Sequence, residues 1–337
     1  GEKSILLVPE QFTSSTEGRI YRELGDALSG MVESFSFTSL AEKILSTEGG
    51  AAVQTLSDAG RAVLVRRALE ELQDNVHYYH RHRRSAAFCQ MAAQTIDELK
   101  SAGLSGQQLA QLAGACGAES GKLSELALIF QGYETLLARS GMDPSDRLEL
   151  AGARLEEALA RHSLPEFLRD RAVFIDEFDT FNAPKKRLLG AMLAALPSVT
   201  VALCDDGAPL LPGDLSLFSG AKQVAAQLRQ LARKNGAEVA VPQLLRKDLR
   251  HRNAPGLAAV AELLETGSCT ADAPAGEVRL FAAPSREEEA RAAAGAIRRL
   301  MRQGVRCGKI AVVCRDIAKY RAAVRYEFRM AEIPLYC

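Results

Sequence analysis

Two kinds of hydrophobic periodicity alternate along the chain. Short apolar runs rich in β-branched residues, typical of buried parallel strands, occur at 5–8, 172–175, 199–203, 278–281 and 310–313. Helical spacing of apolar residues follows these runs, as in Leu188, Met192 and Ala195. This alternation predicts an α/β protein built on a parallel sheet.

Two helix starts are indicated by the sequence. Asn182 precedes Pro184 after the run at 172–175, which is the order of a capping residue and a proline in the first helical turn. Ser285 precedes Glu288 by three positions, the spacing of a capping box. We therefore expect helices to begin at both places.

The strand pattern disappears between about 57 and 160. Val65, Leu69 and Leu72 begin a series of apolar residues at helical spacing with polar residues between them. We expect an all-helical insertion at 57–160 within a first α/β domain formed by 1–56 and 161–266. Small residues at 267–276 show no periodicity and are typical of a linker, so the start of a second α/β domain is expected at 277–337.

Composition narrows the class of protein. The chain has 337 residues, 47% of them hydrophobic and 25% charged, as in a soluble globular protein of two or three domains. Its 42 basic residues balance its 42 acidic ones, so any contact with nucleic acid needs a local patch. The seven cysteines are scattered and lack metal-ligand spacing, and no apolar run is long enough to span a membrane. These features predict a cytoplasmic protein with reduced thiols.

Two carboxylates follow the apolar run at 172–175. Asp176 and Glu177 have the pattern of a Walker B strand end, in which the first carboxylate holds Mg²⁺ through water and the second orients the attacking water. The run at 199–203 also leads into carboxylates, Asp205 and Asp206. The alternative is that acidic residues solvate the turn and favour the start of the next helix.

A phosphate-binding loop is missing from the sequence. No G-x-x-x-x-G-K-[ST] motif occurs, and the nearest lookalike, residues 219–222, lacks the first glycine and a hydroxyl after Lys222. Without that loop the phosphates of a nucleotide have no cradle.

A set of collinear segments resembles the B subunit of the AddAB (RexAB) helicase–nuclease family. In chain order these are 7–11 (LVPEQ), 34–41 (SFSFTSLA), 97–100 (DELK), 122–130 (KLSELALIF), 175–178 (IDEF) with Phe181, 249–253 (LRHRN) and 310–316 (IAVVCRD). The resemblance implies a superfamily-one, RecA-like helicase fold and a role in processing double-strand DNA breaks for recombination. It also implies a heterodimer with the A-type motor and nuclease subunit, close to the nucleoid.

The same resemblance implies that the chain begins just after the phosphate-loop strand and stops soon after entering the second motor domain. ATP and Mg²⁺ would then belong to the longer protein. The nuclease carboxylates and the ligands of an iron–sulfur cluster would lie beyond Cys337.

Residue roles follow from the matching motifs. The resemblance places single-stranded DNA against two segments, Gln11, Phe12 and Thr13 after the first strand and Ser36, Phe37 and Thr38 after the next helix. The alternative for Phe37 is a place in the core.

The resemblance also gives roles at the nucleotide site. Arg315 would face the nucleotide phosphates, unless it pairs with Asp316. The family more usually has Asp-Gly at positions 176 and 177, so the activity of Glu177 is in doubt.

The sequence indicates DNA contact less clearly at two other basic sites. The stretch at 77–84 is the most basic and carries two tyrosines, which fits either a DNA-facing loop or a solvated loop between helices. Arg252 can touch phosphate or cap a helix.

Three functions remain open. The leading hypothesis is a helicase-like part of the B subunit that guides single-stranded DNA and docks the motor subunit. The second is a self-contained ATP-dependent motor whose Walker A loop lies upstream, and the third is a decayed motor that acts only as a scaffold.

Overall fold

The structure, a computed structural model, describes residues 3–245, 251–268 and 277–336. The chain divides into two compact units, Gly1–Leu244 and Leu245–Cys337. Each unit is described by itself below. The first contains a parallel sheet with helices, which confirms the predicted α/β class.

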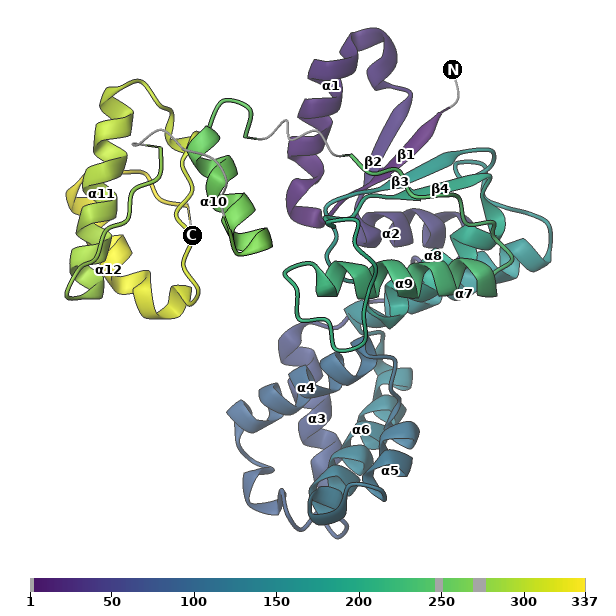
Figure 1. The fold of residues 1–337 in the computed structure, drawn as a ribbon. Helices are drawn as coiled ribbons and strands as arrows, with labels where there is room; N and C mark the ends of the chain where they lie inside the picture. The colour runs from purple at the N-terminus through teal and green to yellow at the C-terminus, as the bar shows by residue number, and fades with distance from the viewer. Residues whose placement is uncertain (1–2, 246–250, 269–276, 337) are drawn as a thin grey trace. The chain divides into compact units, whose positions relative to one another are not determined.

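Four short parallel strands form the sheet of the first unit (Figure 1). β1 (Ser4–Leu7), β2 (Val32–Phe35), β3 (Ala172–Ile175) and β4 (Ser198–Val201) lie in the order β2-β1-β3-β4. Three of these strands were predicted. β2 was missed because Glu33 and Ser34 interrupt its apolar pattern, as is common in an edge strand whose residues are only half-buried.

Helices cover one face of the sheet densely. α2 (Phe37–Glu48), α7 (Pro144–Ala160) and α8 (Ala183–Ala195) share a hydrophobic core with the inward residues of β1 and β3. α9 (Ser219–Lys234) follows along α8. α1 (Thr13–Ser29) lies on the opposite side (Figure 1), where Phe174 of the central strand β3 remains 43% exposed.

Four helices make a second core within the same unit. α3 (Asp58–Glu71), α4 (Ala86–Ser101), α5 (Gly106–Ala113) and α6 (Ser120–Ser140) pack around Phe130, Tyr133 and Ile96. Single turns of 3-10 helix, η2 (His80–His82) and η3 (Gly117–Glu119), lie in the connections. We call α3 to α6 the helical bundle.

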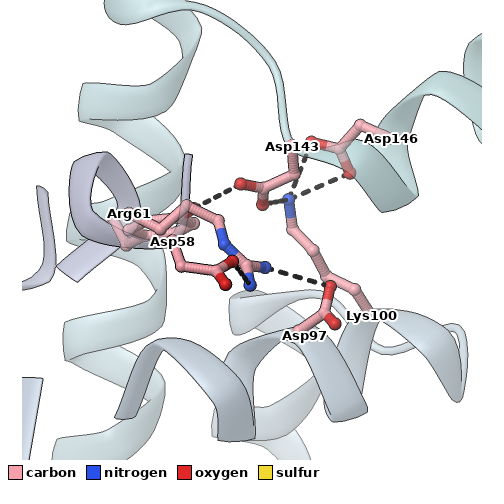
Figure 2. A network of polar contacts seen from close by, with 7 residues as sticks. Asp58, Arg61, Asp97, Lys100, Asp143 and Asp146 are labelled. Atoms are coloured by element: carbon pink, nitrogen blue, oxygen red, sulfur yellow. Dashed lines mark hydrogen bonds and ion pairs between the residues drawn. The ribbon is translucent and has the colours of Figure 1, made fainter. Parts of the chain in front are cut away.

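A polar network around the buried Asp143 joins the helical bundle to the start of α7 (Figure 2). Lys100 donates hydrogen bonds to Asp143 at 2.6 Å and to Asp146 at 2.8 Å, and Tyr133 donates one to Asp143. Arg61 of α3 pairs with Asp58 and with Asp97 of α4. Asp143 precedes α7 but makes no side-chain cap, because its carboxylate is taken by Lys100 and Tyr133.

In its described residues, the second unit consists of helices and irregular backbone. α10 (Pro255–Thr266), α11 (Arg286–Arg302) and α12 (Ile317–Met330) are its helices, and α11 packs against α12 around Ile297 and Phe328. η4 (Cys307–Lys309) is a single 3-10 turn. The strands predicted at 278–281 and 310–313 are wrong: within the described residues both segments lack a backbone ladder, and Leu280 and Val313 are exposed. An apolar run becomes a strand only where a neighbouring strand completes its hydrogen bonds.

None of the helices in the described ranges is both long and apolar enough to cross a bilayer.

Candidate functional site

The carboxyl ends of the four parallel strands meet at one edge of the sheet, which we call the sheet edge. Backbone hydrogen bonds continue one residue past the strands: Val8 N–H donates to Phe35, Asp176 N–H to Leu7 and Ala202 N–H to Ile175, at 2.9 to 3.0 Å. The segments that leave the strands are therefore held side by side. In open α/β sheets this edge is where ligands bind.

Asp176 and Glu177 leave β3 at this edge. Both side chains are exposed, and the Asp176 carboxylate accepts the backbone N–H of Glu177 at 2.8 Å. Glu177 has a φ of 67°, a left-handed conformation that is uncommon for a residue other than glycine. Its carboxylate lies 3.9 Å from the Arg19 guanidinium of α1. The turn thus presents two solvated carboxylates held by local backbone geometry.

These carboxylates are suitable ligands for Mg²⁺, which is commonly held by one or two carboxylates together with water and phosphate oxygens. A cradle of backbone N–H groups for the phosphates is not found among the described residues at the sheet edge, in keeping with the missing G-x-x-x-x-G-K-[ST] motif. The residues present match only the carboxylate side of an ATP–Mg²⁺ site. No hydrolytic step can be derived from them.

Gln11, Phe12 and Thr13 follow β1 in the 3-10 turn η1 (Glu10–Phe12) and the start of α1. Gln11 is exposed, while Phe12 and Thr13 are half-buried. The Thr13 hydroxyl donates to the Glu10 carbonyl at 2.9 Å. Gln11 is the member of this group whose side chain is most open to a ligand.

Ser36, Phe37 and Thr38 follow β2 and begin α2. The Ser36 side chain caps the helix by accepting the Ser39 N–H at 3.0 Å, and Ser39 completes the capping box. Phe37 is 3% exposed, and its ring meets the ring of Phe178 edge-on at 5.2 Å. Ser36 and Phe37 therefore shape the local fold, and Thr38 alone among the three offers an exposed side chain.

Lys185 is a sheet-edge residue that the sequence analysis missed. Its ammonium lies 5.2 Å from the centre of the Phe178 ring and 5.6 Å from that of Phe37. Burial lowers the pKa of Lys185, and Glu10 offsets part of this effect. No hydrogen bond or ion pair of this ammonium with another described residue is found, so the charge is held by aromatic faces and remains available to an anion.

The segment after β4 is held by a buried lysine. Lys222 of α9 is 5% exposed and pairs with Asp206 at 3.0 Å and with Asp214 at 3.4 Å. The backbone N–H of Ala208 and the ammonium of Lys222 lower the pKa of Asp206. Lys222 belongs to the lookalike of a phosphate loop, and its role here is to anchor the loop from 205 to 216.

Comparison with known proteins supplies the family. A family model described as "ADDB, N-terminal" matches residues 1–261. The chain belongs to the AddB family. The resemblance inferred from the collinear motifs is thereby confirmed.

Relatives named as the B subunit of an ATP-dependent helicase/deoxyribonuclease align with the chain over its whole length. Those of Desulforudis audaxviator and Symbiobacterium thermophilum are each 33% identical to it, and the alignment covers 29% of each relative. The protein of Moorella thermoacetica is 32% identical over 350 residues, 30% of its length. The chain spans less than a third of the length of these AddB relatives.

The remaining two candidate residues of this AddB-family chain lie in the second unit. Arg252 is exposed in the turn before α10. Arg315 is exposed just before α12, where Asp316 caps the helix and pairs with Lys319 at 3.1 Å. Both arginines belong to the second unit, whereas the sheet edge belongs to the first.

Within the described ranges, no three His, Cys, Asp or Glu side chains gather as metal ligands. The described cysteines are free thiols.

Proposed function

We propose that this chain is a helicase-like, DNA-guiding part of a protein that processes double-strand breaks together with a motor subunit in the cytoplasm. The observation that carries the proposal is the half-buried ammonium of Lys185. It forms no ion pair with a described carboxylate, although Glu10 acts on its pKa, and it lies over the rings of Phe37 and Phe178, which follow β2 and β3 at the sheet edge. A cation in such a setting suits a phosphate of the nucleic-acid backbone.

Single-stranded DNA fits this edge through three chemical groups. The Lys185 ammonium binds a phosphate, and the side chains of Gln11 and Thr38 are exposed donors for further phosphate or sugar oxygens. The carboxylates of Asp176 and Glu177 repel the same phosphates and so set one limit of the path. The relatives are named as one subunit of an ATP-dependent helicase/deoxyribonuclease, which supports a role in DNA processing beside a second subunit.

Fluorescence anisotropy with a labelled single-stranded oligonucleotide tests the proposal. The Lys185→Gln variant should bind several-fold more weakly and with a smaller salt dependence, by about 0.7 in the slope of log K against log salt for one lost phosphate contact. Lys185→Arg should restore much of the affinity. Equal binding by Lys185→Gln and the unaltered chain would refute the proposal.

Lys186→Gln is the matched control. It removes one positive charge from the same helix turn, but the Lys186 ammonium donates to Gln227 of α9 at 2.7 Å instead of lying over the aromatic rings. Thermal unfolding of both variants separates a loss of binding from a loss of structure. An equal decrease in affinity for both lysine variants would indicate a general effect of net charge and would also count against the proposal.

A further inference from the structure

A basic surface lies in the helical bundle, separate from the residues of the sheet edge. Residues 77–84, which we call the basic loop, connect α3 to α4 and contain three histidines, three arginines, two tyrosines and no acidic residue. Most of these side chains are exposed, and only Tyr79 and Arg83 are half-buried. The loop therefore concentrates positive charge in a chain whose total charge is zero.

Glu125 of α6 fixes the beginning of the basic loop. Its carboxylate accepts three consecutive backbone N–H groups, from His77 at 2.9 Å, Tyr78 at 2.8 Å and Tyr79 at 3.1 Å. Burial alone would raise the pKa of Glu125, but these hydrogen bonds bring it below its usual value. The loop is thus held in one conformation by an ionised group on a different helix.

The two tyrosines have different environments. Tyr79 packs against Phe88 of α4, with ring centres 5.3 Å apart, and anchors the loop on the helical bundle. Tyr78 is 55% exposed, meets Tyr79 edge-on at 4.9 Å, and has the Lys122 ammonium 5.3 Å from its ring centre. An exposed aromatic ring held between a fixed neighbour and a cation is a platform on which a base can stack.

Two arginines of the basic loop are available to a ligand. Arg81 and Arg84 make no hydrogen bond or ion pair with any other described residue, while Arg83 contacts His80. Of the carboxylates near the loop, Glu119 pairs with Lys122, while the ionised Glu125 lies at the beginning of the loop, where it accepts backbone N–H groups and acts electrostatically on His77. The guanidinium groups of Arg81 and Arg84 are therefore exposed and form no ion pair within the described residues.

We propose that the basic loop is a second binding surface for a single-stranded nucleic acid, separate from the sheet edge. Arg81 and Arg84 bind phosphates, and an unpaired base stacks on Tyr78. The surface suits a single strand better than a duplex, because a base can stack on a side chain only where it is not enclosed between neighbouring base pairs. Glu125 is a positioning residue that holds the backbone of 77–79 and with it the Tyr78 ring.

Anisotropy with a labelled single-stranded oligonucleotide compares two double variants of equal charge. Arg81→Ala with Arg84→Ala should weaken binding and reduce the salt slope by about 1.4, the value for two single-strand phosphate contacts. The control, Arg229→Ala with Arg233→Ala, removes two exposed arginines of α9 in the same unit and should change the slope little. Equal effects of the two pairs, or no effect of the loop pair, would overturn the proposal.

Two further variants test stacking and positioning. Tyr78→Ala should lower the affinity about tenfold while Tyr78→Phe keeps most of it, because the ring and not the hydroxyl contacts the base. Glu125→Gln makes the chain more positive, so charge alone predicts tighter binding, whereas loss of positioning predicts weaker binding. Tighter binding by Glu125→Gln, or equal binding by Tyr78→Ala and Tyr78→Phe, would count against the proposal.

These results are independent of those for Lys185. The sheet-edge proposal fails if the Lys185 variants bind normally, whatever the loop variants do. The basic-loop proposal fails on the loop variants alone, and preferential loss of duplex binding in those variants would also overturn it.

Discussion

Lys100 donates a 2.6 Å hydrogen bond to Asp143, which lies 43 positions further along the chain. The pair joins α4 of the helical bundle to the residue that precedes α7, a helix packed on the sheet (Figure 2). Asp143 is only 1% exposed, and Tyr133 donates to its second oxygen. A buried carboxylate in this position depends on both partners.

Removal of the lysine should therefore destabilise the first unit strongly. Lys100→Met keeps much of the side-chain volume but leaves Asp143 as a buried charge without its cation, a change that typically costs about 3–5 kcal/mol. Urea unfolding followed by circular dichroism measures the effect. The control Lys122→Met breaks an exposed pair with Glu119 and should change the free energy of unfolding little.

The stability of this network should depend on pH in the alkaline range. Burial works against the charged form of Lys100, but its hydrogen bonds to Asp143 and Asp146 raise the pKa of the ammonium above its usual value. Burial and the hydrogen bond to Asp143 also raise the pKa of Tyr133. For both groups the folded pKa exceeds the unfolded one, so the stabilisation is complete below the unfolded pKa and is lost as pH rises through the folded pKa.

We expect the free energy of unfolding contributed by this network to stay constant from neutral pH to about pH 10 and to fall above it. The difference between the unaltered chain and the double variant Lys100→Met with Tyr133→Phe isolates the contribution. A difference that grew as pH increased beyond 10 would contradict the expected sign.

Glu177 gives a prediction about backbone strain. Its φ of 67° costs a residue with a side chain about 1 kcal/mol relative to glycine. Glu177→Gly should therefore be more stable than Glu177→Ala by about that amount, although both lose the carboxylate. Thermal unfolding of the two variants makes the comparison, and equal stability would show that the turn relaxes when the side chain is removed.

The same backbone geometry gives a physical reason for the glycine that the family resemblance places at position 177. A residue that must turn sharply out of a parallel strand is most easily a glycine. Glutamate at this position has a left-handed backbone conformation that a side chain disfavours. Such strained conformations are common at functional sites.

Local signals in the sequence predicted local structure well. Asn182 caps α8 and Ser285 caps α11, each accepting the backbone N–H three residues ahead, although the return bond from Glu288 that would complete the predicted capping box is not found. β1, β3 and β4 formed where apolar runs were found. Such features depend on a few consecutive residues, which the sequence displays directly.

Features that need partners distant in sequence were not predicted. The runs at 278–281 and 310–313 have strand composition but no ladder in the described structure. Lys185 was overlooked because the rings that hold it, Phe37 and Phe178, come from separate parts of the chain. The role of Glu125 was missed for the same reason, since a carboxylate in the middle of a helix gives no sign that it caps a remote loop.

Gly103 marks a close approach between the helical bundle and α8. It follows α4 with a φ of 84°, and a Cβ atom placed on it would lie 2.9 Å from the Cβ of Ala183, in the first turn of α8. Gly103→Ala combines an unfavourable backbone conformation with a clash, so we expect it to destabilise the chain by about 2–3 kcal/mol. Urea unfolding measures this loss.

Gly117→Ala is the matched control for Gly103→Ala. Gly117 also has a positive φ, 53°, but a Cβ atom there would meet nothing within 4 Å. It should therefore show the backbone cost alone, about 1 kcal/mol. Adding Ala183→Gly to Gly103→Ala should recover the part of the loss that comes from the clash, because the second change removes the atom that the new methyl group meets. If the double variant is no more stable than Gly103→Ala, the loss arises from the backbone conformation and the two elements do not approach so closely in solution.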